Sequence, residues 1–107
     1  MENTIEISSE GKLKANIFCI AGKEGDFFIA IAPSLKLSAN SKESQEQAKV
    51  NLKEALDWFF KYYNTEESLD KELKRLGWKD HSEPDFSNVP MSLLENKPEM
   101  YREEVYA

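Results

Sequence analysis

Residues 44–63, SQEQAKVNLKEALDWFFKYY, decide the fold because they carry the longest regular pattern in the chain. Their apolar side chains recur at steps of three and four, which predicts an amphipathic α-helix with one face to bury. The residues of that face are Ala48, Leu52, Ala55, Leu56, Phe59, Tyr62 and Tyr63. Ser44 and Gln47 have the spacing of a capping box, which predicts Ser44 as the N-cap. Trp58 and Phe60 flank the apolar face and widen it, so the helix needs a broad surface to pack on.

The chain before this helix is expected to supply that surface as strands. Residues 4–8 and 12–21 alternate polar and apolar side chains, and residues 26–32, DFFIAIA, are rich in aromatic and β-branched types that favour a central strand. Residues 22–25 are expected to form a four-residue hairpin connection. Residues 35–39 alternate again and are interpreted as an extended arm before the helix.

A second, shorter helix is expected to follow the first. Asn64 is interpreted as its N-cap, and leucines at helical spacing continue the pattern to Leu76. Gly77 then stands where a left-handed residue ends a helix, and Trp78 is placed to pack back on Leu73. We therefore interpret Trp78 as part of the helix end, with a functional role as the alternative.

These patterns predict an α+β domain. We expect a three- or four-stranded, mainly antiparallel sheet packed by one long helix, then a second short helix and an irregular C-terminal tail. We place the domain at residues 1–80 and a proline-broken, acidic extension at 81–107, which packs either on the same domain or on a second subunit. Residues 100–106 fit a helix, because Tyr101 and Val105 are four apart, and they also fit an edge strand.

Composition narrows the class of protein. The chain has 107 residues, of which 40% are hydrophobic and 32% are charged, as in an ordinary single domain. No apolar run approaches the length that crosses a bilayer, and the first residues lack the pattern of a secretion signal, so no membrane association is expected. Cys19 is the only cysteine, which permits no internal disulfide and fits a cytoplasmic location.

The net charge of −6 is unevenly distributed. Residues 1–63 carry nine acidic and eight basic side chains, a sum of −1, whereas residues 64–107 carry eleven and six, a sum of −5. The second part should therefore repel phosphate backbones and attract basic partners. The alternative is that an acidic surface serves only to keep the protein in solution.

The search for catalytic chemistry points away from an enzyme. His81, the one histidine, has Asp80 and Glu83 nearby but no further ligand or nucleophile at suitable spacing. Cys19 lies in an apolar alternation, which predicts a buried and inert thiol. The glycines form no phosphate-binding loop. We therefore expect no catalytic residue, no metal and no cofactor.

The order of motifs resembles a known family. An acidic-glycine turn leads into an aromatic strand ending in proline, EGDFFIAIAPSL at 24–35; Ser44 then precedes AKVNLKEAL at 48–56. Over residues 12–63 this order is similar to the core of HicB-type antitoxins. The resemblance implies a β-β-β-α-β domain, a partly degenerate ribonuclease-H-like fold without catalytic residues. It also implies a role, which is to occlude the active site of a small basic toxin that cleaves RNA.

Two departures from the family limit what is expected. The chain has Pro33-Ser34-Leu35 where such antitoxins often have a Pro-Gly-Cys-like turn, and its last part is too short and proline-broken for a DNA-binding domain. We therefore expect no direct DNA binding. The alternative function is a stand-alone, homo-oligomeric accessory domain without a toxin, and a homo-oligomer is expected in either case. The expected partner-binding residues, which could equally be core positions, are Phe28, Leu35, Leu37 and Trp58.

Overall fold

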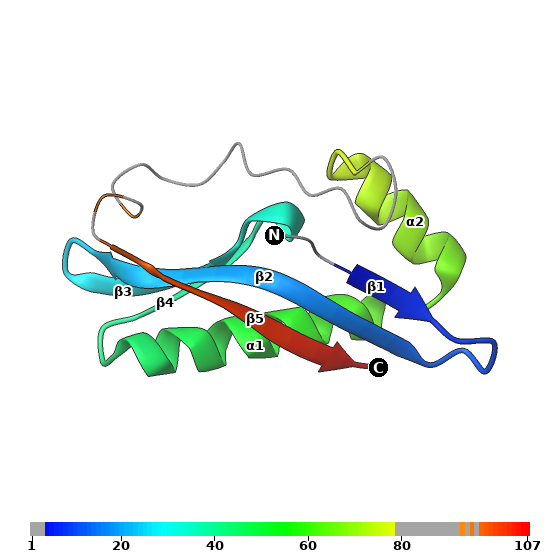
Figure 1. Ribbon diagram of the computed structural model, residues 1–107, viewed down its shortest axis with the longest axis horizontal. Coiled ribbons are helices and arrows are strands. Elements are labelled where there is room, and N and C mark those ends of the chain that lie inside the picture. The colour runs from blue at the N-terminus through cyan, green and yellow to red at the C-terminus, as the bar shows by residue number, and fades with distance from the viewer. Residues whose placement is uncertain (1–3, 79–92, 94, 96) are drawn as a thin grey trace.

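Strand β2 (Leu13–Glu24) is the centre of the sheet, because three other strands pair with it. The structure is a computed structural model that describes residues 4–78, 93, 95 and 97–107. In these residues β1 (Thr4–Ile7), β3 (Phe27–Ala32) and β5 (Glu99–Tyr106) pair antiparallel with β2. Strand β4 (Leu37–Ser41) pairs antiparallel with β3. The predicted α+β class is confirmed, with a long and a short helix beside an antiparallel sheet (Figure 1).

The register shows how the strands are arranged around β2. Ala15 pairs with both β1 and β5, and Ala21 pairs with both β3 and β5. A strand has two edges, so β1 and β3 share one edge of β2 and β5 occupies the other. The sheet therefore has β4 and β5 on its two sides, with β1 continuing the line of β3.

The alternation of β2 buries one complete face. Its inward residues are at most 2% exposed and form the main core with the helices; they are Leu13, Ala15, Ile17, Cys19 and Ala21. The other face is also covered in its middle, where Phe18 and Ile20 pack with Ile31 and Leu93 in a second cluster. This part of β2 is therefore covered on both faces.

Helix α1 (Gln45–Tyr62) begins at the predicted cap. The Ser44 Oγ accepts a hydrogen bond from the Gln47 backbone N–H over 3.0 Å. The second half of the expected capping box is replaced, because the Gln47 side chain donates to the Asn51 Oδ1 at 2.9 Å. Helix α1 runs along the sheet on the face of the main core (Figure 1).

Helix α2 (Glu66–Arg75) lies near β1, at the end of the sheet away from the β2–β3 turn (Figure 1). The expected cap was wrong by one residue: the Oγ1 of Thr65, not the Asn64 side chain, accepts the Ser68 N–H at 3.1 Å. Threonine and asparagine both cap helices, so their adjacent positions could not be separated by residue type.

The end of α2 matches the prediction. The Trp78 N–H donates to the Leu73 carbonyl oxygen at 2.9 Å, and the Gly77 N–H donates to the Lys74 carbonyl oxygen at 3.0 Å. These two bonds define a Schellman motif, which requires a left-handed residue at position 77. Gly77 has φ 97°, so a residue without a Cβ suits this position.

Two connections are shorter than expected. Strand β2 continues to Glu24, so the hairpin loop consists of Gly25 and Asp26 only, with Gly25 at φ 62°. A two-residue hairpin with glycine at its first position fits a type II′ turn. A 3₁₀ turn, η1 (Pro33–Leu35), then joins β3 to β4, and the expected arm at 35–39 is the paired strand β4.

The expectation of an irregular C-terminal tail was wrong for Glu99–Tyr106. These residues form β5, which pairs with β2 over eight positions of the same chain and raises the described sheet to five strands. The helix and strand alternatives for 100–106 both rested on the spacing of neighbouring residues. The structure shows a strand, because these residues pair with β2, which is distant in the sequence. None of the helices formed by the described residues is long and apolar enough to cross a membrane.

Candidate protein-binding surface

The four expected partner-binding residues do not form one surface. Leu35 is only 2% exposed and belongs to the main core, so it supports the fold at η1. Phe28 and Leu37 are half-buried and pack against that core, but they lie at opposite ends of the β3–β4 pair. Trp58 alone is largely exposed, at 70%. The surface that the structure offers is therefore centred on Trp58.

Trp58 and Tyr62 lie one turn apart on the same side of α1 and are 70% and 77% exposed. Sequence analysis placed Tyr62 on the buried face, which was wrong. Phe60 and Tyr62 lie about 80° to either side of Leu52, since a helix turns about 100° per residue. The fold covers only the Phe60 side, and Phe60 is fully buried. The helix pattern alone does not show which of the two flanks, that of Phe60 or that of Tyr62, faces the solvent.

We call this area the α1 surface and define it by five outward residues. They are Glu54, Asp57, Trp58, Lys61 and Tyr62, all exposed. The Lys61 Nζ lies 5.3 Å from the centroid of the Trp58 ring, a cation–π distance that keeps the ammonium beside the indole. The Asp57 carboxylate accepts from the Lys53 Nζ at 2.6 Å. The surface thus presents two aromatic rings among charged groups of both signs.

The aromatic rings of this surface are supported by a chain of ring contacts that reaches the core. Tyr62 contacts Tyr63 with ring centroids 4.8 Å apart, Tyr63 contacts Phe59 at 5.0 Å, and Phe59 contacts Phe60 at 5.0 Å. Edge-to-face and tilted arrangements of this kind are favourable beyond their buried area. Tyr62 is therefore exposed but held in position, which lowers the entropy lost when a partner binds.

The α1 surface lies on the β4 side of the helix. The Asn51 Nδ2 donates to the Asn40 carbonyl oxygen of β4 at 3.1 Å, and Asn51 is seven positions, or about two turns, before Trp58. On the other side of α1, the Lys49 Nζ donates to the Glu99 Oε2 of β5 at 2.7 Å. The Trp58 and Tyr62 rings are consequently on the side of the helix away from strand β5, whereas Asp57 lies nearer to Glu103 of that strand.

A second group of chemically active side chains lies between α1 and β5. Lys49 contacts the Tyr101 ring at 4.4 Å from its centroid, and the Gln45 Nε2 donates to the Glu99 Oε1 at 2.9 Å. The hydrogen bond from Lys49, and next that from Gln45, lowers the pKa of the Glu99 carboxyl. The ion pair raises the pKa of Lys49 in turn. Lys49 is therefore held as a cation, not as a base.

The buried thiol and phenol beside this ion pair are unreactive by position. Burial raises the pKa of Cys19 to about 12, and burial followed by the neighbouring Cys19 raises the pKa of Tyr101. The thiol donates weakly to the Ile17 carbonyl oxygen at 3.5 Å, whereas the Tyr101 hydroxyl is buried without a hydrogen-bond partner in the described part. A thiol that stays protonated is a poor nucleophile.

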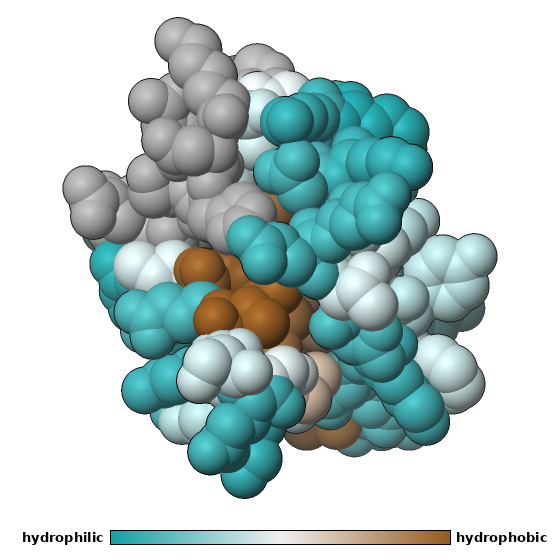
Figure 2. Space-filling model, turned by 90° about the vertical axis from the view of Figure 1, so that its right-hand side faces the viewer, coloured by the Kyte–Doolittle hydropathy of each residue, from teal (hydrophilic) through white to brown (hydrophobic). Residues whose placement is uncertain are grey.

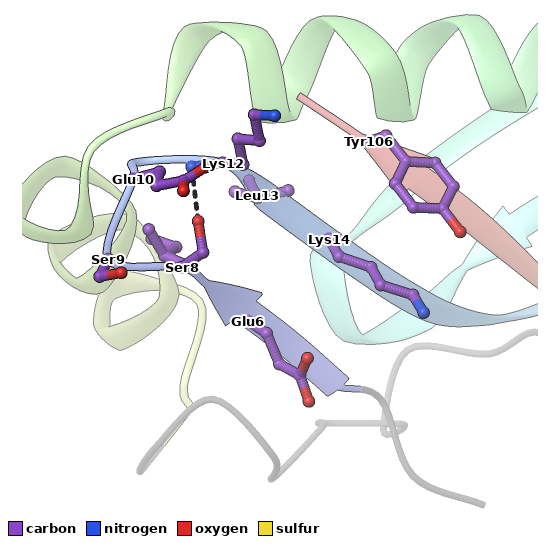
Figure 3. Close-up of a pocket in the computed structure, with 9 residues that line it drawn as sticks. Glu6, Ser8, Ser9, Glu10, Lys12, Leu13, Lys14 and Tyr106 are labelled. Carbon is purple, nitrogen blue, oxygen red and sulfur yellow. Dashed lines mark hydrogen bonds between the residues drawn. The ribbon is translucent and has the colours of Figure 1, made fainter.

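An open hollow of about 540 Å³ lies at the β1–β2 hairpin (Figure 3). Glu6, Lys14 and Tyr106 extend into it in a row across β1, β2 and β5. The Lys12 backbone N–H donates to the Ser8 Oγ at 3.1 Å within the turn. Seen from this end, the surface is hydrophilic around a small apolar area (Figure 2). The charged side chains that line the hollow are of both signs and exposed to solvent. They therefore do not favour a ligand of either charge.

The remaining expected features bear on metals and on relatives. His81 lies outside the described residues, and within residues 4–78, 93, 95 and 97–107 no three His, Cys, Asp or Glu side chains gather as a metal site would require. Comparison with protein-family models, with curated proteins and with solved structures finds no match to this chain.

Proposed function

We propose that this chain is a non-catalytic protein-binding module of the HicB antitoxin type, which neutralises a small basic toxin that cleaves RNA in the cytoplasm. The observation that carries the proposal is the pair of exposed rings, Trp58 and Tyr62, on the α1 surface. Tryptophan and tyrosine are enriched among the residues that contribute most to protein–protein binding. Direct DNA binding and catalysis are not part of the proposal.

The order of elements supports this assignment. Strands β2, β3 and β4, helix α1 and strand β5 follow one another in the β-β-β-α-β order that the HicB resemblance implies. Strand β1 and helix α2 are additions to that order. We include a partly degenerate ribonuclease-H-like arrangement in the proposal, since it is what the resemblance implies for these five elements.

The charge distribution supports a basic partner. Residues 64–107 carry a net charge of −5, and the α1 surface adds Glu54 and Asp57 beside the two rings. Complementary charges steer the encounter and raise the association rate, and salt screens this effect. A complex held in this way should bind faster and more tightly at low ionic strength.

The chemistry of the described residues supports a binding role over an enzymatic one. The Cys19 thiol is kept protonated by burial, and Lys49 is kept charged by Glu99. Neither group is exposed as a nucleophile or as a general base, the two roles that reactive side chains of this type fill in enzymes.

The test is a binding and inhibition experiment. The full chain is immobilised, a lysate of the cell that makes it is passed over at low and at high salt, and retained proteins are identified by mass. Support requires a protein of net positive charge that is retained at low salt, cleaves RNA, and loses that activity when the purified chain is added in equal amount. Retention without inhibition of an RNA-cleaving activity contradicts the proposal.

A pair of variants links the inhibition to the α1 surface. Trp58→Ala should weaken binding at least about tenfold, as truncation of a central aromatic residue does. Val50→Ala, which shortens another exposed apolar side chain two turns earlier on α1, is the matched control and should bind as the wild type does. Equal affinity of both variants would show that the toxin binds elsewhere.

The second candidate function is a stand-alone, homo-oligomeric accessory domain. It is favoured by the outer edge of β5, on which no other strand lies within the described part of the chain and which offers a surface for a second copy without any toxin.

A further inference from the structure

Strand β5 has one edge paired with β2 and, among the described residues, no strand on its other edge. The backbones of Leu13 and Ala107 exchange two hydrogen bonds, of 2.8 and 3.0 Å, at the end of this pairing. In an antiparallel ladder such pairs alternate, so the odd-numbered residues of β5 direct their N–H and C=O groups at β2. The even-numbered residues, which are Met100, Arg102, Glu104 and Tyr106, direct theirs outward.

This edge carries some of the features that block pairing and lacks others. Natural edge strands are short, or carry lysine or other charged residues, an inward-pointing charge, proline or a bulge. Strand β5 carries charged residues, with Glu103 on the side of α1, but it is eight residues long, contains neither lysine nor proline, and pairs in continuous register. The opposite edge, β4, has five residues, and its Asn40 carbonyl oxygen is already bonded to Asn51. Of these two outer edges, β5 has the longer row of outward backbone groups among the described residues.

We propose that a second copy of this chain occupies the edge, with β5 paired antiparallel to β5 of its partner about a two-fold axis at Glu103. In this register Arg102 lies opposite Glu104 of the other copy, and Met100 lies opposite Tyr106. All four residues have outward backbone groups, so these four opposed pairs are the hydrogen-bonded ones and supply about eight inter-chain bonds. The interface is isologous, as in most dimers.

The side chains of β5 are complementary in this register. Two Arg–Glu pairs form, and opposite charges directly across an antiparallel pair are favourable. Arg102 also interacts within its own chain, but a guanidinium has five donors and can hold both contacts. The two Met–Tyr pairs bring together side chains that are 51% and 65% exposed in the single chain. Both pairs lie on the face of the sheet opposite α1.

Neighbouring registers are less favourable. A shift that centres the axis on Arg102 or on Glu104 opposes two like charges at the axis and also separates Arg102 from Glu104 of the other copy. A centre at Tyr101 opposes Glu99 and Glu103 twice. A centre at Val105 leaves few residues to pair. All of these registers oppose the outward backbone groups, but only the centre at Glu103 pairs Arg102 with Glu104.

The register centred on Glu103 has one unfavourable contact, and a substitution that relieves this contact can identify the register. The two Glu103 side chains oppose each other at the axis, on the face covered by α1. Burial raises the pKa of the Glu103 carboxyl; Lys53 and Lys49 of α1 oppose this shift, and Asp57 adds to it. Replacing Glu103 with glutamine removes the repulsion without changing shape, and it should therefore strengthen the dimer.

The proposal does not depend on the proposed toxin binding, and it specifies the interface of the second candidate function. The Trp58 and Tyr62 rings lie on the β4 side of the helix, away from β5, so a dimer would leave these rings exposed in both copies. The dimer is measured on the purified chain alone, and its absence would not affect the inhibition experiment.

The first experiment is a charge exchange followed by sedimentation equilibrium. Arg102→Glu and Glu104→Arg should each raise the dimer dissociation constant at least about tenfold, because each alters both symmetric pairs. The double variant should return to within about threefold of the wild type. Glu103→Gln should lower the dissociation constant. Glu43→Arg, at an exposed site outside β5, makes the same charge change as Glu104→Arg and should leave it unaltered.

Three results would overturn the proposal: a wild-type chain that stays monomeric to about 1 mM, single variants without effect, or a double variant that fails to recover. Amide hydrogen exchange gives a readout that needs no variant. The amides of Met100 and Glu104 should become more protected as the concentration rises, whereas those of Glu103 and Val105, already bonded to β2, should not change. Exchange at Met100 and Glu104 that stays fast in a dimer would place the interface elsewhere.

Discussion

The Trp78 indole Nε1–H donates a hydrogen bond of 2.7 Å to the Ser34 carbonyl oxygen, across 44 positions of sequence. Both residues are buried, with Trp78 3% exposed and Ser34 fully enclosed. Ser34 lies in η1, between β3 and β4, and Trp78 closes the Schellman motif of α2. Trp78 therefore ends α2 through its backbone N–H and, through its indole, fixes that end to the connection between two strands.

Removing this hydrogen bond together with part of the indole should destabilise the fold. Trp78→Phe keeps an aromatic ring but removes the N–H that donates to the buried Ser34 carbonyl oxygen, which costs about 1–3 kcal/mol. The cavity left by the smaller ring adds to that cost. We expect the free energy of unfolding in urea to fall by at least this amount.

The matched control is Trp58→Phe, the same exchange at a site that is 70% exposed. It should change the free energy of unfolding by less than about 0.5 kcal/mol, as surface substitutions usually do. Equal losses in both variants would mean that the indole–carbonyl bond contributes nothing specific.

Sequence patterns predicted what depends on neighbours along the chain. The Ser44 cap, the α1 stripe and the glycine stop at Gly77 follow from local spacing, and each is confirmed except for Tyr62 in the stripe. The bond from Trp78 to Ser34 could not be predicted, because its two groups meet only when α2 packs near η1. Local pattern therefore identified Trp78 as structural without identifying its main partner.

Strand β5 shows the limit most clearly. Tyr101 and Val105 suit one face of a helix and one face of a strand equally, so the sequence left both alternatives open. Pairing with β2 over eight positions decides between them, and that pairing is a property of the whole sheet. The α1 surface also depends on the packing of the whole fold. Tyr62 is exposed because the rest of the chain covers the other flank of the helix, where Phe60 lies.

Gly22 of β2 is predicted to be required for the packing of Leu93. A Cβ placed on Gly22 would lie 2.8 Å from the Leu93 Cδ1, and Leu93 is fully buried in the second cluster. Gly22→Ala should therefore lower the free energy of unfolding by about 1–3 kcal/mol through overpacking. Thermal or urea unfolding monitored by circular dichroism provides the measurement.

A double-mutant cycle identifies the contact. Leu93→Ala alone should cost about 2–5 kcal/mol, because it leaves a cavity. In the double variant the smaller side chain at position 93 makes room for the new methyl group. The loss of unfolding free energy should therefore be about 1 kcal/mol smaller than the sum of the losses in the two single variants. Strict additivity would show that the two side chains do not meet.

The ion pair between Lys49 and Glu99 predicts a loss of stability in acid. Its hydrogen bonds lower the pKa of Glu99 in the folded chain, below the unfolded value of about 4.3. This contribution is complete above the unfolded pKa and is lost as the pH falls through the folded pKa. Urea unfolding measured from about pH 6 to about pH 3 should show a smaller acid-induced loss for Glu99→Gln than for the wild type.

At neutral pH, Glu99→Gln should cost only about 0.2–1 kcal/mol, since the carboxylate is 39% exposed. Glu46→Gln is the matched control, because Glu46 lies 3.7 Å from the same Lys49 ammonium but is 80% exposed. Its pH profile should stay close to that of the wild type. A Glu99→Gln profile parallel to the wild type would contradict the role of this pair.

The last prediction concerns Cys19, whose pKa burial raises to about 12. At about pH 8 the folded chain holds almost no thiolate, and thiolate is the form that reacts with disulfide reagents. Native protein should therefore react with such a reagent only as fast as β5 or the surrounding core opens, and the unfolded chain should react at once.

Tyr101→Ala, which removes the neighbouring phenol on β5, should speed the native reaction at least about tenfold. Tyr106→Ala shortens an exposed ring on the same strand and should leave the rate unchanged. Rapid labelling of the wild type would show that the pairing of β5 with β2 does not shield Cys19 in solution.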